Sequence, residues 1–254
     1  MHRFYITDLN ESEKEVIITG SDVNHIANVL RLSVDDEITV SDGSSRDYLC
    51  KITSIDPKNE CAVHADIIDI FDSNAELPVK IYLFQGVPKG DKLETVIQKN
   101  VELGVHEIIP VMMERTVVKI DDSKKEKRIK RYNGISEAAA KQSGRGIIPV
   151  VNSYMTFKQA LDYASDMDCC LVPYESAEGM DYSRNVFKEL ADKGRQSKGI
   201  KAAVFIGPEG GFSASEIEAL KGINARVVSL GHRILRTETA GMTVMSILSF
   251  LMDD

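Results

Sequence analysis

The pattern of apolar and polar positions changes near residue 72. Before this point, short runs rich in Val, Ile and Tyr are separated by polar turn residues such as Asp42-Gly43-Ser44, which predicts β-strands. We place these strands at residues 15–19, 37–41, 48–55 and 62–68, with one short helix at about residues 21–30. Several short strands in succession favour a small β-barrel.

Residues 72–78 are polar and end in proline, which is typical of a linker. Beyond them, apolar strand-like runs alternate with segments of helical periodicity. We predict strands at residues 79–87, 107–113, 169–174, 202–207 and 226–230, and helices at 92–103, 123–142, 213–221 and 237–252. Ser213 and Glu216 have the spacing of a capping box at the start of the third of these helices. This alternation predicts a mostly parallel sheet with helices on both faces, and such sheets bind ligands at the carboxyl ends of their strands. The chain therefore divides into residues 1–72 and residues 73–254.

The composition is that of a globular protein, with 43% hydrophobic and 28% charged residues in 254 positions. No apolar run reaches the roughly 18 residues that a membrane span needs. The N-terminal sequence turns polar at once, unlike a secretory signal, so we expect a cytoplasmic protein without a membrane partner. Neither the four cysteines nor the five histidines have a metal-binding spacing, so we predict free thiols and no metal.

The charge is unevenly distributed along the chain. The net charge is −8, yet residues 114–146 carry ten Lys or Arg against five Asp or Glu. A basic block on an acidic protein is a candidate surface for the phosphates of a nucleic acid. The alternative, which charge alone does not exclude, is a helix face exposed to solvent.

Two segments that follow predicted strands are candidates for chemistry. The first is Gly207-Pro-Glu-Gly-Gly211, where glycines permit a close approach of the backbone to a ligand. A turn built only for connection is the alternative, and the density of special residues favours a binding role. The second is residues 230–240, where arginine can grip a phosphate or orient a base. Its alternative is a helix start with Thr237 as cap and Glu238 on the dipole. Neither segment matches a Walker or classical dinucleotide motif.

At these residues the sequence resembles the ribosomal RNA small subunit methyltransferase E (RsmE) family of the SPOUT superfamily. The matching motifs are Gly207-Pro-Glu-Gly-Gly-Phe212, Leu230-Gly-His-Arg-Ile-Leu-Arg-Thr-Glu-Thr-Ala240, Lys99-Asn-Val-Glu-Leu-Gly-Val105, Glu137-Ala-Ala-Ala-Lys-Gln-Ser-Gly-Arg145 and His25-Ile-Ala-Asn-Val-Leu-Arg31. The chain departs from the family at Asn100, where a small residue is expected, and at Ser44-Ser45, where a more glycine-rich turn is usual.

The resemblance implies an α/β protein with an N-terminal PUA-like β-barrel and a C-terminal SPOUT α/β domain with a deep trefoil knot. It also implies a homodimer. The implied reaction is S-adenosylmethionine-dependent methylation of N3 of a uridine in 16S rRNA, at the position usually numbered 1498. The implied substrate is the assembled 30S subunit in preference to naked RNA.

The resemblance places the donor among three loops, residues 171–175, 207–211 and 230–240. The expected cofactor-binding residues are Leu171, Pro173, Glu175, Gly207, Pro208, Glu209, Gly210, Gly211, Leu230, Gly231, Ile234, Leu235, Thr239 and Ala240. We expect the backbone amides of Thr239 and Ala240 to approach the donor carboxylate. The RNA-binding candidates are Arg3, Arg31, Arg46, Lys89, Arg128, Arg131, Gln142 and Arg145.

Methylation at uridine N3 requires loss of the N3 proton, so the site needs a group that stabilises the uridine anion. Arg236 is our candidate for that group, with Glu238 orienting the arginine or relaying the proton. One alternative is an RNA-binding ribosome assembly factor without catalysis. Another is a SPOUT methyltransferase that acts on a ribose 2′-OH or on tRNA.

Overall fold

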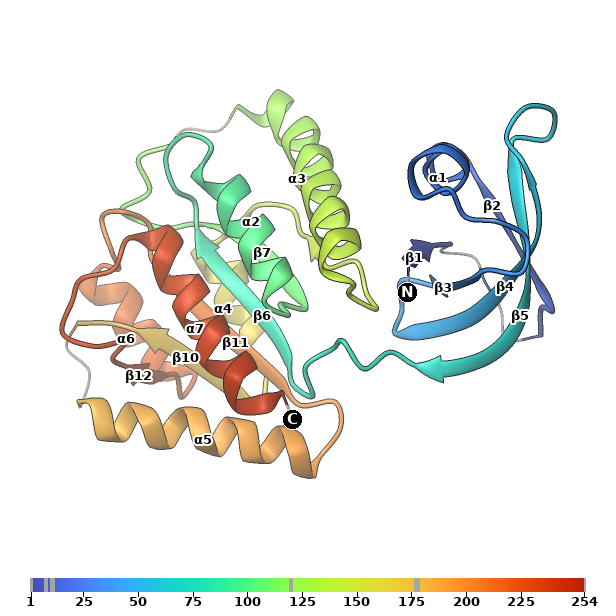
Figure 1. The fold of residues 1–254 in the computed structure, drawn as a ribbon. Helices are drawn as coiled ribbons and strands as arrows, with labels where there is room; N and C mark the ends of the chain where they lie inside the picture. The colour runs from blue at the N-terminus through green and yellow to red at the C-terminus, as the bar shows by residue number, and fades with distance from the viewer. Residues whose placement is uncertain (1, 7–8, 10–11, 119–120, 176–178, 254) are drawn as a thin grey trace. The chain divides into compact units, whose positions relative to one another are not determined.

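The computed structural model describes residues 2–6, 9, 12–118, 121–175 and 179–253. These residues form two compact units (Figure 1). One unit comprises residues 1–76 together with 140–148, and the other comprises 77–139 together with 149–254. The sequence placed 140–148 in the second domain; in the structure this segment joins the first unit.

The first unit is built on a five-stranded sheet with strand order β1-β3-β4-β5-β2. Its elements are β1 (His2–Tyr5), β2 (Glu15–Thr19), α1 (Ser21–Asn24), a π-helical turn (His25–Leu30), β3 (Glu37–Ser41), β4 (Arg46–Asp56) and β5 (Ala62–Asp72). Burial alternates along β2, with Val16 and Ile18 facing the core. The four predicted strands are confirmed, and β1 is an additional strand that sequence analysis missed.

The predicted barrel is not confirmed as a closed one. Strands β1 and β2 form the two edges of the sheet, and no pairing joins them in the part of the chain that the structure describes. β4 and β5 are each 11 residues long and their pairing contains two register shifts, features that bend a sheet. The unit is therefore a curved, open sheet.

Buried polar contacts hold residues 140–148 in the first unit. Ser44 forms a β-bridge with Ile147, and the amide of Ser45 donates to the carbonyl of Gly146. Arg145 has only 3% of its surface exposed and its guanidinium pairs with Glu76. The carboxylate of Glu76 also accepts hydrogen bonds from the amides that follow Arg145. This segment is thus fixed by tertiary contacts that local sequence does not reveal.

The second unit contains a seven-stranded sheet with order β12-β10-β11-β6-β7-β8, in which β9 also pairs with β7. The strands are β6 (Lys80–Gly86), β7 (Glu107–Met112), β8 (Val150–Val151), β9 (Met155–Thr156), β10 (Cys169–Pro173), β11 (Lys201–Ile206) and β12 (Arg226–Val228). Each pairing in this sheet is parallel, as predicted.

Helices cover both faces of this sheet (Figure 1). They are α2 (Lys92–Glu102), α3 (Asp122–Ser143), α4 (Phe157–Ala164), α5 (Met180–Gln196), α6 (Ala214–Gly222) and α7 (Thr237–Met252). On one face α7 packs between α2 and α5. On the other, α4 and α6 pack over Tyr82, Phe84 and Phe205 in one hydrophobic core.

Helices α4 and α5 were not predicted. α4 has only eight residues, although Thr156 and Gln159 form a capping box at its start. α5 begins after Gly179, whose φ of 105° suits glycine and which offers no capping side chain. Because start signals were weak or the helix was short, sequence analysis passed over both. The capping box that it predicted at Ser213 and Glu216 is confirmed.

Candidate functional site

A cleft of about 810 Å³ opens in the second unit at the carboxyl ends of β10, β11 and β12. This is the edge of a parallel sheet at which ligands are expected, and the volume suits a small organic molecule. The walls are the segment after β10, residues 206–212 and residues 229–237. The two motifs singled out in the sequence therefore lie together.

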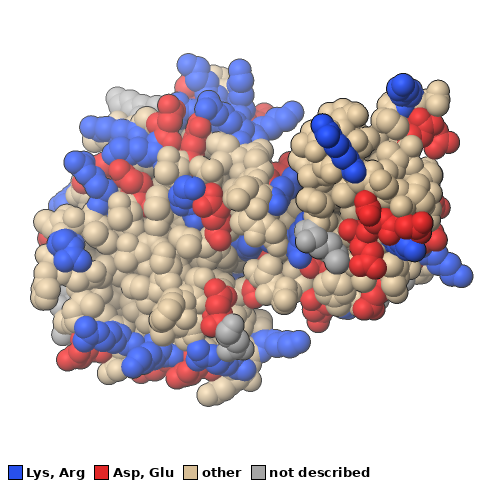
Figure 2. Space-filling model, in the orientation of Figure 1, with Lys and Arg blue, Asp and Glu red and all other residues tan. Residues whose placement is uncertain are grey.

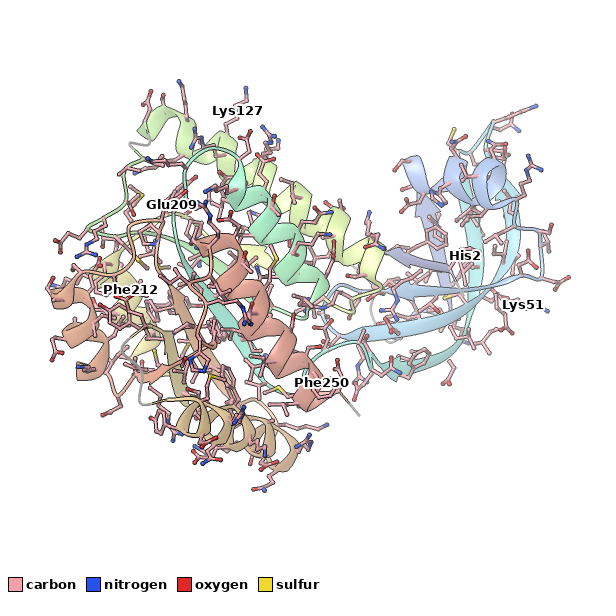
Figure 3. The ribbon with its side chains drawn as sticks, turned by 60° about the vertical axis from the view of Figure 1, so that its left-hand side comes forward. His2, Lys51, Lys127, Glu209, Phe212 and Phe250 are labelled. Atoms are coloured by element: carbon pink, nitrogen blue, oxygen red, sulfur yellow. The ribbon has the colours of Figure 1, made fainter. Side chains whose placement is uncertain are left out.

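The 207–211 loop has a backbone shape that favours glycine. Gly211 has a φ of 68°, and its amide donates to the carbonyl of Pro208 at 2.9 Å, which closes a tight turn. A Cβ on Gly207 would lie 3.2 Å from the backbone of Gly211, and one on Gly210 would lie 2.9 Å from the Cβ of Arg115. Backbone atoms, more than side chains, therefore form this wall of the cleft. Glu209 and Phe212 of this region are labelled in Figure 3.

The 230–236 loop leads into α7 and carries the candidate catalytic arginine. Arg236 is exposed on the cleft and is the N-cap residue of α7, with no capping bond from its side chain. Thr237 is not the cap; it is the first helical residue and is buried. The alternative in which this segment is only a helix start capped by Thr237 is therefore wrong in its geometry.

A cluster of charged groups lies beside the 207–211 loop. The Nζ of Lys92 is 3.0 Å from Oε1 of Glu209 and 3.8 Å from Oε2 of Glu238. Glu209 also accepts a hydrogen bond from the amide of Lys89. Burial alone would raise the pKa of the Glu209 carboxyl, but the bonds from Lys92 and Lys89 outweigh it, so this pKa is lowered. Glu209 is therefore an anion that anchors its loop to the start of α2.

Glu238 lies beside Lys92, and the structure describes no ion pair between Glu238 and Arg236. The predicted role of Glu238 in orienting Arg236 is therefore not seen. The Oε2 atom of Glu238 is buried and accepts no hydrogen bond among the described residues. Oε2 can therefore accept a hydrogen bond, and the ammonium of Lys92 lies next to it.

The positions of the predicted donor-binding residues differ in two places from the expectation. All except Leu171 and Thr239 line the cleft. Leu171 is fully buried within β10, because an apolar residue in the middle of a central strand packs into the core. The amides of Thr239 and Ala240 both donate to the carbonyl of Arg236 at 2.9 Å. They complete the first turn of α7 and are already hydrogen-bonded there, so the structure does not support the predicted contact of these amides with a donor carboxylate.

Arg115 and the second role of Glu216 were not predicted from the sequence. The Nη1 of Arg115 donates to the carbonyl of Gly210 at 3.0 Å, at the rim of the cleft. The buried carboxylate of Glu216 accepts from the amides of Glu114 and Ser213, which ties the turn after β7 to the start of α6. Arg115 follows the carboxyl end of β7. The rule that ligands bind at the carboxyl ends of parallel strands could therefore have pointed to it. The other missed cleft residues are Tyr174, Gly179, Met180, Ile206, Phe212, Ser229, His232, Arg233 and Thr237.

The RNA-binding candidates fall into two groups. Arg31, Lys89, Arg128, Arg131 and Gln142 are exposed, and Arg46, beside Asp72, is half exposed. In contrast, Arg145 is buried against Glu76, and Arg3 pairs at 2.8 Å with Asp47, whose side chain is fully buried. Each of these two guanidiniums neutralises a carboxylate of its own unit, so we assign Arg3 and Arg145 structural roles in place of RNA contacts.

Lysines and arginines gather over the N-terminal half of α3 (Figure 2). Arg128 and Arg131 lie three residues apart on this helix, and Arg131 pairs with Glu94 while its side chain stays 65% exposed. Lys119, which belongs to the same basic run, lies outside the described residues. A cationic surface thus occupies one helix of the second unit.

A second, apolar groove of about 590 Å³ lies between α5 and α7. Its lining includes Phe187, Met242 and Ile247, and Phe250 near the end of α7 is 85% exposed (Figure 3). In the 230–236 loop, Ile234 is 91% exposed. Large apolar side chains exposed in this way mark surfaces that bind another molecule.

The four cysteines are free thiols: Cys50 and Cys170 are buried, Cys169 is partly buried and Cys61 is exposed. Burial raises the pKa of the Cys50 thiol to about 12, so it is protonated and unreactive. Among the described residues, no group of three or more His, Cys, Asp or Glu side chains is arranged for a metal ion. No helix in the described part of the chain has the length and apolar character of a membrane span.

Comparisons with known proteins agree with this site. Residues 75–249 match a family model described as an RNA methyltransferase domain, and residues 18–63 match one described as an RNA methyltransferase PUA domain. Ribosomal RNA small subunit methyltransferase E from Bacillus subtilis is 37% identical over 98% of this chain and 96% of its own length. Its counterpart from Mesomycoplasma hyopneumoniae is 30% identical over 97% and 98%. The same enzyme from Neisseria gonorrhoeae, solved bound to S-adenosyl methionine, superposes with a TM-score of 0.79 at 29% identity, over 99% of this chain and 98% of that one.

Proposed function

This chain belongs to the ribosomal RNA small subunit methyltransferase E family, and from that premise we propose that it methylates ribosomal RNA with S-adenosylmethionine as donor. We propose further that the acceptor is N3 of a uridine in 16S rRNA, at the position usually numbered 1498. The observation that carries the proposal is the cleft at the strand ends, where the 207–211 and 230–236 loops face each other.

The cleft fits the donor in size and in the chemistry of its walls. Its lining includes Gly207, Gly210, Gly211 and Gly231, whose backbone amides and carbonyls can bond an adenine and a ribose. Glycines at 207 and 210 keep these walls free of side chains; a Cβ at either position would press on Gly211 or Arg115. The predicted donor-binding residues that line the cleft are retained in the proposal: Pro173, Glu175, Gly207, Pro208, Glu209, Gly210, Gly211, Leu230, Gly231, Ile234, Leu235 and Ala240.

Bound S-adenosylmethionine supplies an electrophilic methyl group on a sulfonium and leaves as S-adenosylhomocysteine. The protein must hold the base in line with that group and manage the proton on N3. Arg236 is exposed on the cleft and cationic, so it stabilises the negative charge that spreads to O2 or O4 as the N3–H bond breaks. An arginine is too basic to take that proton itself.

Glu238 is the candidate acceptor for the proton. Its Oε2 is buried and accepts no hydrogen bond among the described residues, and Lys92 lies 3.8 Å away. Glu238 does not line the cleft, and its side chain is 26% exposed, so the proton from N3 would reach its carboxylate through water. The balanced reaction yields N3-methylated uridine, S-adenosylhomocysteine and one proton, which passes from Glu238 to solvent.

Isothermal titration with S-adenosylmethionine and with S-adenosylhomocysteine tests the donor site. We expect saturable binding of both at one site per chain, because both share the adenosine that the loops would hold. In the matched variant Gly210→Val, the new side chain would meet Arg115 and narrow the cleft, so binding of both ligands should weaken. Absence of binding by the wild-type protein, with and without 30S subunits, would contradict the proposal and favour the assembly-factor alternative.

The proposed RNA partner is 16S rRNA within the 30S subunit. The exposed candidates Arg31, Arg46, Lys89, Arg128, Arg131 and Gln142 support this part of the proposal. Phosphates bind such cations by displacing counterions, whatever the RNA sequence.

Reversal of charge on α3 is expected to weaken RNA binding. In an Arg128→Glu, Arg131→Glu variant, affinity for any RNA should fall by at least tenfold at low salt, and the salt dependence should become shallower because fewer counterions are released. Filter binding at several salt concentrations measures both effects. Lys158→Glu on α4, an exposed lysine outside α3 and outside the apolar groove, serves as the control, and equal affinity of the α3 variant and wild type would remove α3 from the RNA-binding surface.

We also propose that the protein is a homodimer and that the groove between α5 and α7 contributes to the interface. Phe250 and the groove lining provide the apolar surface that a dimer would bury. By family membership we propose that the first unit is a PUA-like domain with an open sheet, that the second unit is a SPOUT domain with a deep trefoil knot, and that the protein is cytoplasmic. In the sheet of the second unit, β11 lies between β6 and β10, and β12 lies beyond β10. The spatial order of these strands therefore differs from their order in the sequence, which supports the proposed knot.

A further inference from the structure

A buried chain of hydrogen bonds joins three segments of the second unit beneath the cleft. Gln85, near the end of β6, is fully buried, and its Nε2 donates to Oγ1 of Thr237 at 2.8 Å. The hydroxyl of Thr237 in turn donates to the carbonyl of Gly207 at 2.6 Å. Gln85 and Thr237 are 152 positions apart in the sequence.

The direction of each bond in this chain follows from the atoms involved. A hydroxyl has one hydrogen, and the carbonyl of Gly207 can only accept, so the hydrogen of Thr237 points to Gly207. Oγ1 must then accept from its other neighbour, which requires the NH₂ side of the Gln85 amide. The same NH₂ group donates its second hydrogen to the carbonyl of Gly86 at 3.0 Å. Among uncharged side chains, only an amide carries two hydrogens on one nitrogen.

Two members of this series of hydrogen bonds, Gly207 and Thr237, belong to the two sides of the proposed site. Gly207 is the first residue of the 207–211 loop, and its carbonyl lies where β11 gives way to that loop. Thr237 directly follows Arg236 and starts α7. A shift of Thr237 therefore moves the backbone that carries Arg236, and a shift of Gly207 moves the wall that would hold the donor.

We propose that Gln85 is a positioning residue, which holds the 207–211 loop and Arg236 in register through the hydroxyl of Thr237. This inference rests on the proposed function. Gln85 itself does not line the cleft and acts only through its neighbours. Its location inside the sheet makes the reference point rigid, because β6 is paired on both sides, with β11 and with β7.

The orientation of the amide has a cost that supports a role beyond packing. With Nε2 committed to Thr237 and Gly86, the Oε1 atom of Gln85 is buried without a hydrogen-bond partner among the described residues. An apolar side chain at this position would avoid that penalty. What Gln85 contributes at this position is therefore the pair of hydrogen bonds that its Nε2 donates to Thr237 and Gly86.

Asn100 provides a matched control. It is a second fully buried amide, on α2, and its Oδ1 likewise accepts no hydrogen bond among the described residues. Gly241 of α7 packs near both amides, since a Cβ built on it would lie 3.5 Å from Oδ1 of Asn100 and 3.7 Å from Oε1 of Gln85. The Nδ2 of Asn100, however, donates to the carbonyl of Val96 within its own helix. It has no bond to either loop of the cleft.

The test is a double-mutant cycle on Gln85→Met and Thr237→Val. Binding of S-adenosylhomocysteine is measured by titration, and kcat and the KM for 30S subunits are measured by methyl transfer. Each single variant should lose about five- to tenfold in ligand affinity and a similar factor in kcat, with the KM for 30S subunits unchanged. Both substitutions interrupt the same series of hydrogen bonds. The double variant should therefore lose little more affinity and kcat than the more impaired single variant.

The controls separate positioning from stability and from the proposed function. Thr237→Ser keeps the hydroxyl and should restore affinity, whereas Asn100→Ala should lower the melting temperature without changing affinity or kcat. Additive losses in the double variant, or equal effects of Asn100→Ala and Gln85→Met at matched stability, would overturn the positioning role. If the wild-type protein binds neither ligand and transfers no methyl group, it is the proposed function that fails.

Discussion

An Arg236→Ala variant is expected to lose kcat by roughly 10²- to 10³-fold, the effect of removing one group that stabilises charge in a transition state. The donor should still bind with nearly wild-type affinity, because Gly207, Gly210, Gly211 and Gly231 line the cleft and leave their backbone atoms available to hold it. Folding should also be preserved. The Arg236 side chain is exposed and makes no hydrogen bond or ion pair within the described part of the chain, and such surface changes alter stability by about 0.5 kcal/mol at most.

Arg233 supplies the control for this experiment. It is a second exposed arginine on the same loop and lines the same cleft. If general positive charge were sufficient, Arg233→Ala and Arg236→Ala would slow the reaction equally. Single-turnover measurements at saturating donor and 30S subunits report the chemical step for each variant. Wild-type turnover by Arg236→Ala would remove this residue from the mechanism.

A Gly86→Ala variant is expected to bind the donor at least 100-fold more weakly and to unfold more easily. A Cβ at this position would lie 2.5 Å from the backbone nitrogen of Pro208 and 2.9 Å from the carbonyl carbon of Gly207. Neither is the end of a flexible side chain, so the 207–211 loop itself must move. Overpacking of this kind costs about 1–3 kcal/mol in stability, and the displaced loop closes on the cleft that would hold the donor.

Titration with S-adenosylhomocysteine and thermal unfolding measure the two effects of Gly86→Ala. The matched variant is Gly134→Ala in the interior of α3, where a Cβ meets no atom within 4 Å. This control should bind normally and gain about 0.5–1 kcal/mol in stability, because alanine favours a helix more than glycine does. Normal donor affinity of Gly86→Ala would show that the loop tolerates the displacement, and would weaken its assignment as the donor site.

Much of the architecture could be predicted because its signals are local. The continuous apolar run at β6 and the capping box at Ser213 and Glu216 are contained within a few residues each, and both are confirmed. The meeting of the 207–211 and 230–236 loops followed from a general rule about parallel sheets. These predictions needed no knowledge of how distant segments pack.

The contacts that complete the site were beyond local analysis because they join distant positions. Gln85 and Thr237 are 152 residues apart, and the bond from the amide of Glu114 to Glu216 spans 102 residues. A glutamine within a strand and a glutamate within a capping box each had a sufficient local explanation. The sequence therefore offered no reason to look for a second role.

The same limit explains the errors among the charged residues. Arg128 and Arg145 both belong to the basic block of residues 114–146, and their sequence neighbours do not distinguish them. In the structure, Arg145 is buried against Glu76, whereas Arg128 is exposed. Burial of a cation depends on a carboxylate that another part of the chain supplies. Glu238 was paired with Arg236 because they are neighbours in sequence, whereas the fold places Lys92 of α2 beside it.

Methyl transfer to 30S subunits that lack the modification is the decisive measurement. The purified protein is incubated with these subunits and methyl-labelled S-adenosylmethionine, and the RNA is digested to nucleosides and analysed by mass spectrometry. We expect about one methyl group per subunit, recovered as 3-methyluridine from 16S rRNA and formed roughly 10²- to 10³-fold more slowly by Arg236→Ala. No transfer, or label on a ribose 2′-OH or on added tRNA, would contradict the proposed function.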